Sequence, residues 1–175
     1  MKIGLVRHFK VAQPLPKGFL IDFDTLSNWF DKYDEADVVT ATVDMRNIAW
    51  QKCYASSMSR ATKTARHIYE GPIHTHDDLR EINVLGLMNK ARKLPIMVWA
   101  LIIKRKTFTR NAVSVEARDK LNAFVDTLLQ QQEQEILVVS HGFVMMFLQK
   151  ALTARGFSGE TFGNPANGKV YVFEK

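Results

Sequence analysis

The sequence predicts an α/β fold: a single three-layer domain with a mostly parallel central sheet and helices on both faces. Its 175 residues suit one domain. Short apolar runs, which are typical of buried strands, alternate with longer segments of helical periodicity. No internal repeat, low-complexity tract or Gly/Ser-rich linker divides the sequence. We therefore expect residues 1–175 to form one domain, with a basic, lid-like segment at about residues 83–110.

Four apolar runs are expected to be strands. Residues 3–6 form the first, and residues 52–56 form a second, short one. Residues 136–139 are Ile, Leu, Val and Val, which is the strongest strand signal in the chain because such residues favour strands. Residues 169–173 alternate valine with aromatic residues and are expected to be the last strand.

Four segments have the apolar spacing of helices. They are residues 25–36, the stretch after residue 56 as far as residue 68, residues 115–132 and residues 143–152. An amphipathic helix is clearest in residues 115–132, where the apolar positions include Leu121, Phe124, Val125, Leu128 and Leu129. Alternating strands and helices predict a mostly parallel sheet that is covered on both faces.

Composition and charge exclude some classes of protein and admit others. With 46% hydrophobic and 24% charged residues, the chain is neither disordered, nor a collagen, nor a disulfide scaffold. Its net charge of +6 allows an anionic partner: nucleic acid, anionic lipid or a phosphorylated substrate. The charge is unevenly distributed along the chain, because residues 82–115 contain no acid. The simplest interpretation of such a basic stretch is a face exposed to solvent. The basic residues in that stretch are Lys90, Arg92, Lys93, Lys104, Arg105, Lys106 and Arg110.

The lone cysteine and the apolar runs bear on the location of the protein. Cys53 has no partner for an internal disulfide, which is expected in a reducing compartment, and we expect it to be buried as an apolar residue. The N-terminus lacks a signal-peptide core. The longest nearly apolar run, residues 94–103, is shorter than the roughly 20 residues that span a bilayer. The sequence predicts a cytoplasmic protein without a transmembrane segment.

Polar residues suited to chemistry follow three of the predicted strands. Arg7 and His8 follow the first strand, Arg60 lies one turn into the helix after the second, and His141 follows residues 136–139. In parallel sheets, ligands bind at the edge where the strands end and loops lead into helices. We therefore expect two arginines and two histidines to meet at one edge of the sheet.

This set of residues suits the chemistry of phosphate esters. Arginine presents a planar fork of donors to phosphate oxygens, and helix N-termini offer N–H groups to an anion. A neutral imidazole is a competent nucleophile toward phosphorus. A general acid for the leaving group is also needed, and residues 77–81, Asp-Asp-Leu-Arg-Glu, supply candidates. The pair His74 and His76 lacks a third ligand for a metal site.

Four short motifs, in this order, resemble those of one known family. They are Leu-Val-Arg-His at residues 5–8, Ser-Ser-Met-Ser-Arg-Ala-Thr-Lys-Thr-Ala at 56–65, Leu-Arg-Glu at 79–81 and Val-Val-Ser-His-Gly at 138–142. Together they are similar to the motifs of the histidine phosphatase superfamily, phosphoglycerate mutase-like, branch 1. The resemblance spans residues 1 to about 150 and implies the same fold class.

The resemblance implies a role for each matched residue. His8 would attack phosphorus and become phosphohistidine. Arg7, Arg60 and His141 would hold the phosphoryl oxygens, and Glu81 would protonate the leaving oxygen and then activate water. Neither a metal nor a cofactor is implied. The function implied is hydrolysis of a phosphomonoester, with a phosphorylated small molecule or a phosphoprotein as substrate and without a nucleic-acid partner.

Three positions depart from the family pattern. Phe9 stands in place of a glycine that lets backbone approach phosphate, and it either narrows the pocket or points away from it. Lys10 replaces an acidic or amide residue and is expected to add positive charge at the pocket mouth. Gln13 is the nearest counterpart of the family's asparagine.

Several alternatives stay open at this stage. A phosphoglycerate mutase-type phosphotransferase would pass the phosphoryl group to a second hydroxyl; the lack of large insertions favours a phosphatase. A catalytically weak phosphate-binding module would result if Phe9 blocked the nucleophile. Residues 83–110 have three possible interpretations. They form a helix packed on the sheet with a basic end in water, a lid over an anionic substrate, or a contact with a membrane or polyanion.

Overall fold

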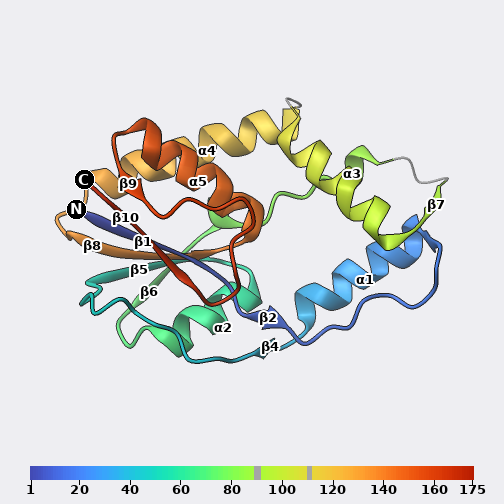
Figure 1. Cartoon of the computed structure of the whole chain (residues 1–175), viewed down its shortest axis with the longest axis horizontal. Coiled ribbons are helices and arrows are strands. Elements are labelled where there is room, and N and C mark those ends of the chain that lie inside the picture. The colour runs from blue at the N-terminus through green and yellow to red at the C-terminus, as the bar shows by residue number, and fades with distance from the viewer. Residues whose placement is uncertain (89–91, 110–111) are drawn as a thin grey trace.

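The computed structural model is built around a six-stranded sheet with the strand order β6-β5-β8-β1-β10-β9. The structure describes residues 1–88, 92–109 and 112–175, without the side chains of residues 112–114. Figure 1 shows the sheet with both chain termini at one end of it. The strands are β1 (Lys2–Arg7), β5 (Lys52–Ser56), β6 (Ile73–His76), β8 (Glu135–Ser140), β9 (Ser158–Gly159) and β10 (Val170–Glu174).

The sheet is mostly parallel, as the sequence predicts. β1 runs parallel to β8, β5 runs parallel to β8 and β6 runs parallel to β5. In the first of these pairs Arg7 lies opposite Ser140, so β1 and β8 end side by side. β10 pairs with β1 in the antiparallel direction, and the short β9 extends that edge. Parallel strands that end in register bring their following residues to one edge, which positions the site described below.

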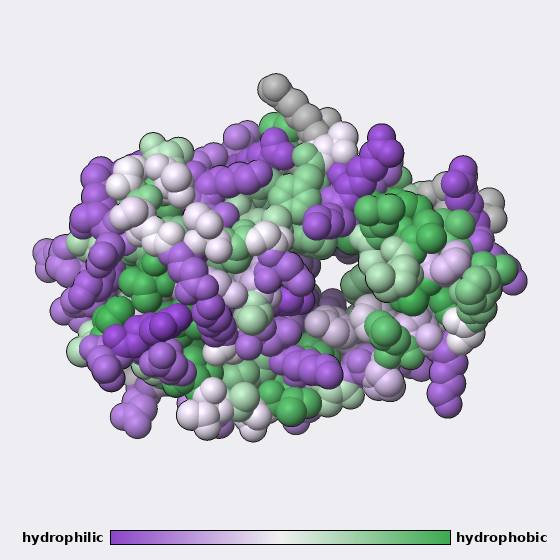
Figure 2. Space-filling model, viewed as in Figure 1, coloured by the Kyte–Doolittle hydropathy of each residue, from purple (hydrophilic) through white to green (hydrophobic). Residues whose placement is uncertain are grey.

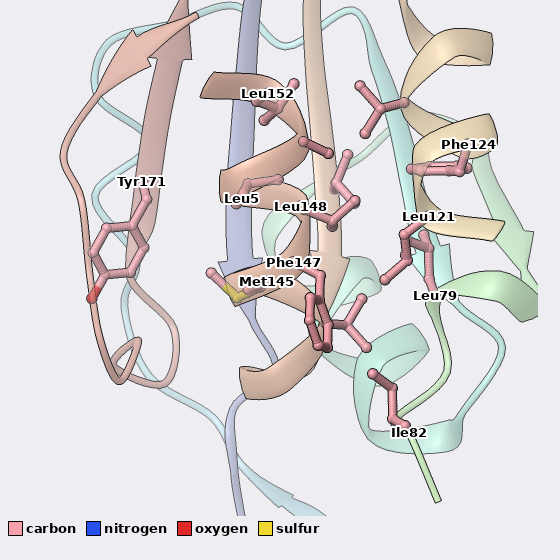
Figure 3. Close-up of a cluster of buried hydrophobic side chains, with 14 of the residues drawn as sticks. Leu5, Leu79, Ile82, Leu121, Phe124, Met145, Phe147, Leu148, Leu152 and Tyr171 are labelled. Carbon is pink, nitrogen blue, oxygen red and sulfur yellow. The ribbon is translucent and has the colours of Figure 1, made fainter. Parts of the chain in front are cut away.

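Helices cover both faces of the sheet, which gives the expected three layers (Figure 1). α2 (Ser59–Ile68) covers one face, while α4 (Ala112–Leu129) and α5 (Gly142–Ala154) cover the other. The larger core lies between the sheet and these last two helices, and Figure 3 shows Leu5 of β1 against Leu148 and Leu152 of α5. The smaller core contains Cys53, which is buried as expected.

Two further helices form a lobe beyond the ends of the parallel strands. α1 (Phe23–Glu35) begins at the cap Asp22, and α3 (Ile96–Phe108) lies beside it. β3 (Ile21–Asp22) pairs with β7 (Lys93–Leu94), and Trp99 Nε1 of α3 donates to the Ile21 carbonyl at 2.8 Å. We call α1, α3 and the loop of residues 14–22 the α1–α3 lobe. Figure 2 shows an opening between this lobe and the main body.

The lobe corrects one expectation and limits another. α3 packs against α1 and α4 rather than on the sheet, so the interpretation of residues 83–110 as a helix packed on the sheet is wrong. Two of the basic residues expected in this segment, Lys90 and Arg110, lie outside the described residues. In the part of the chain that is described, no helix is long and apolar enough to cross a membrane.

The remaining elements are short. β2 (Lys10–Val11) pairs with β4 (Val38–Val39) in a two-stranded ribbon. Two single-turn helices, η1 (Asp77–Leu79) and η2 (Leu85–Leu87), follow β6. The strand β6, which contains His74 and His76, is missing from the four strands predicted from apolar runs, because its sequence alternates polar histidines with little apolar length.

Candidate active site

Residues from three neighbouring strand ends meet at the edge of the sheet that faces the lobe. The backbone N–H of His8, just beyond β1, donates to the carbonyl of Ser140 at the end of β8 at 2.9 Å. His141 follows directly, and its ring centroid lies 5.1 Å from that of His8. Both histidines are buried. The structure thus brings together the two histidines that the sequence placed after separate strands.

The hydrogen bonding of His8 fixes its tautomer. Nδ1 lies 2.6 Å from the carbonyl oxygen of Phe9, which is an acceptor, so Nδ1 carries the proton. Burial lowers the pKa of His8 to about 3, and the nearby guanidinium groups of Arg60 and Arg7 act in the same direction. The ring is therefore neutral at physiological pH, with a free lone pair on Nε2. A neutral imidazole in this tautomer can act as a nucleophile through Nε2.

His141 is held by a second chain of hydrogen bonds. Arg60 Nε donates to His141 Nδ1 at 3.2 Å, and since an arginine Nε is always a donor, Nδ1 is unprotonated. The proton is then on Nε2, which donates to Ser56 Oγ at 2.9 Å. Burial and the positive charge of Arg60 keep the pKa of His141 well below its usual value. Ser56 is a residue of this site to which the sequence alone assigns no role.

Arg60 is covered by two consecutive residues of α1. Its Nη1 lies 2.5 Å from the Asp34 carboxylate, and its guanidinium stacks over the Tyr33 ring at 5.1 Å. Arg60 is 3% exposed, whereas the Asp34 side chain is 48% exposed. Helical periodicity marks Tyr33 as one of the apolar positions of residues 25–36, and nothing in the sequence distinguishes Asp34 from the neighbouring acids. Periodicity identifies which face of a helix is apolar but not which element that face meets.

Arg7 brings a second guanidinium to the same edge. Its Nη1 donates to the Pro165 carbonyl at 3.0 Å, while its buried Nε has no hydrogen-bond partner among the described residues. The guanidinium lies against Gly142, the first residue of α5, where an added Cβ would stand 3.5 Å from Arg7 Cζ. The first N–H groups of a helix lack intrahelical acceptors and favour an anion. An unpaired donor beside a helix N-terminus suits a phosphate oxygen.

Glu81 is the acid best suited to proton transfer among the three candidates of residues 77–81. Burial raises its pKa to about 7, against the opposing effects of Arg60 and of the Ile82 N–H, which donates to Oε1 at 3.4 Å. A carboxyl group with this pKa is partly protonated at neutral pH, so it can both give and accept a proton. Asp77 instead pairs with Ser57 and is 80% exposed in its side chain.

Phe9 points away from this edge. Its ring is buried, makes an edge-to-face contact with His67 and packs against Gly168, which has a φ of 67°. The Phe9 N–H donates to Thr64 Oγ1 of α2 at 2.9 Å. Of the two interpretations of Phe9, the one in which its ring narrows the pocket is wrong. Lys10, the second position that departs from the family pattern, is exposed in β2.

Comparison with known proteins identifies the family. The model of the histidine phosphatase superfamily (branch 1) matches residues 35–174, well over half of the chain. The chain therefore belongs to the histidine phosphatase superfamily, and its activity is of the phosphatase or mutase type. The matched range contains Arg60, Glu81 and His141; Arg7 and His8 precede it and join the site through the pairing of β1 with β8.

Solved structures share the fold at low sequence identity. A phosphoserine phosphatase variant from Entamoeba histolytica, solved with phosphoserine, is 16% identical, with a TM-score of 0.57 over 98% of this chain and 89% of that one. The α-ribazole phosphatase from Shigella flexneri is 17% identical, with a TM-score of 0.52 over 87% and 79%. A mycobacterial glucosyl-3-phosphoglycerate phosphatase is 13% identical, with a TM-score of 0.54 over 86% and 78%. No curated protein matches the chain.

Proposed function

We propose that the protein is a phosphomonoesterase that works without a metal ion, through a phosphohistidine on His8. The observation that carries the proposal is the tautomer of His8: the hydrogen bond from Nδ1 to the Phe9 carbonyl leaves Nε2 as the free lone pair. The low pKa of His8 keeps that lone pair available across physiological pH. The substrate class is a phosphorylated small molecule or a phosphoprotein.

In the first step, His8 Nε2 attacks phosphorus and the bond between phosphorus and the leaving oxygen breaks. Glu81 gives its proton to that oxygen, so the alcohol leaves neutral. Arg7 and Arg60 neutralise the charge that spreads over the equatorial oxygens in the transition state. His141 joins them when its Nε2–H donates to a phosphoryl oxygen instead of to Ser56 Oγ.

In the second step, the Glu81 carboxylate takes a proton from water while the water oxygen attacks phosphorus. The bond between phosphorus and His8 Nε2 breaks, inorganic phosphate leaves and Glu81 is again protonated. The positive charge that many phosphatases draw from metal ions comes here from Arg7, Arg60 and the N-termini of α2 and α5. The proposal is supported by the names of the structurally similar proteins, which are phosphatases.

The test is hydrolysis of an aryl phosphate in the presence of a chelator, between pH 5 and pH 8. We expect His8→Ala to lower turnover at least about a hundredfold, which corresponds to about 2.7 kcal/mol of barrier. His74→Ala, an exposed histidine in β6, is the matched control and should keep wild-type turnover. Equal turnover by wild type and His8→Ala would contradict the mechanism. Transfer of the phosphoryl group to a second substrate hydroxyl in preference to water would assign a mutase-type phosphotransferase instead.

Two smaller proposals accompany this one. The whole chain, residues 1–175, forms one domain, and its basic segment at about residues 83–110, which contains α3, acts as a lid over the active site. The protein acts in the cytoplasm, a proposal supported by its single, buried Cys53.

A further inference from the structure

We propose that the outer face of the α1–α3 lobe binds anionic lipid membranes. The first observation is a group of large apolar side chains on the lobe that face solvent, where Figure 2 shows apolar residues gathered over α3 and the loop before α1. Monomeric proteins rarely expose such groups without an interaction to cover them. Their exposed fractions are Leu15 63%, Phe19 82%, Leu20 53%, Met97 77%, Val98 38% and Leu101 66%.

These side chains belong to one continuous region of the fold. Phe19 and Leu20 directly precede β3, which pairs with β7 through Ile21 and Leu94. Met97 and Leu101 lie one turn apart in α3, so they project from the same side of that helix. Trp99 lies on the opposite side of α3 and holds this helix to the loop of residues 14–22 through its hydrogen bond with the Ile21 carbonyl. The exposed apolar side chains are therefore held outward by a buried anchor.

The same face is positively charged. Its exposed basic residues are Lys17, Arg92, Lys93, Lys104 and Arg105. Residues 14–22 and 92–108 contain one acid, Asp22, which lies 3.7 Å from Lys93 Nζ, and the other acids of the lobe are in α1: Asp24, Asp31, Asp34 and Glu35. In residues 14–22 and 92–108 these five cations thus stand against one acid. Each Lys or Arg near an anionic membrane adds to binding, and apolar insertion together with basic contacts gives stable attachment.

Charge also discriminates between possible partners. A second copy of the chain packed symmetrically on this face would set its five cations against five identical ones, which is unfavourable. A nucleic acid would satisfy the cations but would leave the aliphatic side chains of Leu20, Met97 and Leu101 against water or phosphate. An anionic bilayer satisfies both groups, because its headgroups meet the cations and its interfacial region takes the apolar side chains.

The geometry of the lobe fits surface attachment. α3 has 13 residues and is therefore about 20 Å long, too short to span a bilayer but long enough to lie along its surface. α1, in the same lobe, places Tyr33 and Asp34 over Arg60. Attachment through α3 would hold the edge of the sheet that contains His8 and His141 close to the membrane.

The test is co-sedimentation of the full chain with vesicles of phosphatidylcholine alone or mixed in equal parts with phosphatidylglycerol. We expect binding to the mixed vesicles that weakens as salt rises from about 0.05 M to about 0.5 M. The double variant Phe19→Ser, Met97→Ser should bind at least about tenfold more weakly. Lys104→Gln with Arg105→Gln should cost about 25-fold at low salt.

Control variants separate this face from the rest of the surface. Val39→Ser alters an apolar residue of β4 that is 55% exposed outside the lobe and should bind as wild type does. Lys120→Gln with Lys150→Gln removes two exposed charges from α4 and α5 and should cost much less than the Lys104, Arg105 pair. Equal thermal unfolding curves would show that all variants are folded.

Three outcomes would overturn the proposal: no sedimentation with mixed vesicles at low salt, equal loss of binding in lobe and control variants, or a stable dimer in solution that Phe19→Ser dissociates without any vesicle binding. None of these readouts depends on phosphatase activity, so the membrane proposal and the proposed function succeed or fail separately.

Discussion

Replacing Glu81 by glutamine removes the proposed proton donor while keeping the size of the side chain, and the expected effect depends on the leaving group. An alkyl alkoxide needs a proton to leave, whereas 4-nitrophenolate does not. General acids contribute roughly 10²–10⁴-fold, so we expect Glu81→Gln to slow the first turnover of an alkyl phosphate about 10³-fold at pH 6. For 4-nitrophenyl phosphate the loss should be less than about tenfold.

The pH dependence follows from the pKa of about 7 on Glu81. Above that pH the wild type loses its proton donor and should slow about tenfold per pH unit with the alkyl phosphate, whereas Glu81→Gln should stay level. At pH 9 about 1% of Glu81 is protonated, so the 10³-fold difference should shrink to about tenfold. The pKa of about 3 on His8 predicts no loss of nucleophile down to about pH 4.

The assay is release of the leaving group in the first turnover by rapid quench, with enzyme in excess over substrate. This isolates phosphorylation of the enzyme from hydrolysis of the phosphoenzyme, in which the proposed role of Glu81 is that of a base for both substrates. Equal losses with the alkyl and aryl phosphates in the first turnover, or a wild-type profile that is flat through pH 7, would refute the assignment of Glu81 as general acid.

Three further predictions concern single residues. Asp34→Asn should strengthen competitive inhibition by inorganic phosphate about fivefold, because the half-exposed carboxylate that competes for Arg60 is gone; a weaker inhibition would show that Asp34 positions Arg60 instead. Phe9→Ala should lower the free energy of unfolding in urea by about 3–5 kcal/mol, since a buried ring is lost, while turnover per folded molecule changes little; a loss of turnover without a loss of stability would contradict this. Burial raises the pKa of Glu81 to about 7 in the folded state, so its contribution to the free energy of unfolding is fully present below about pH 4.5 and is lost as the pH rises through about 7. Glu81→Gln should therefore be more stable than wild type at pH 8.5 by about 3 kcal/mol, with little difference at pH 4.5; parallel stability profiles would be the contrary result.

The arrangement at the strand ends could be predicted from sequence because it depends on local rules. Apolar runs identified β1, β5 and β8, and parallel strands place the residues after them at one edge. The contact between His8 and Ser140 follows from that topology alone. Strand β10 was predicted, but its antiparallel direction depends on how the chain returns from α5, which no residue pattern specifies.

The cover over Arg60 could not be predicted in the same way. The helix that contains Tyr33 and Asp34 was predicted within two residues at its N-terminus, but its place beyond the sheet depends on the lobe as a whole. Trp99 and Ile21 are 78 residues apart, and the hydrogen bond between them holds that lobe together. Phe9 likewise departs from the family motif in the sequence, but only its contacts with His67 and Gly168 show where its ring packs.

The most direct test of the mechanism is the position of phosphorylation in a trapped phosphoenzyme. The enzyme would be mixed with an aryl phosphate, quenched in alkali, which preserves phosphohistidine, and digested for mass spectrometry and ³¹P NMR. Because His8 Nδ1 is committed to the Phe9 carbonyl, we predict a phosphoryl group on His8 Nε2 that is absent from His8→Ala. A phosphoryl group on Nδ1, on His141 or on no histidine at all would contradict the account.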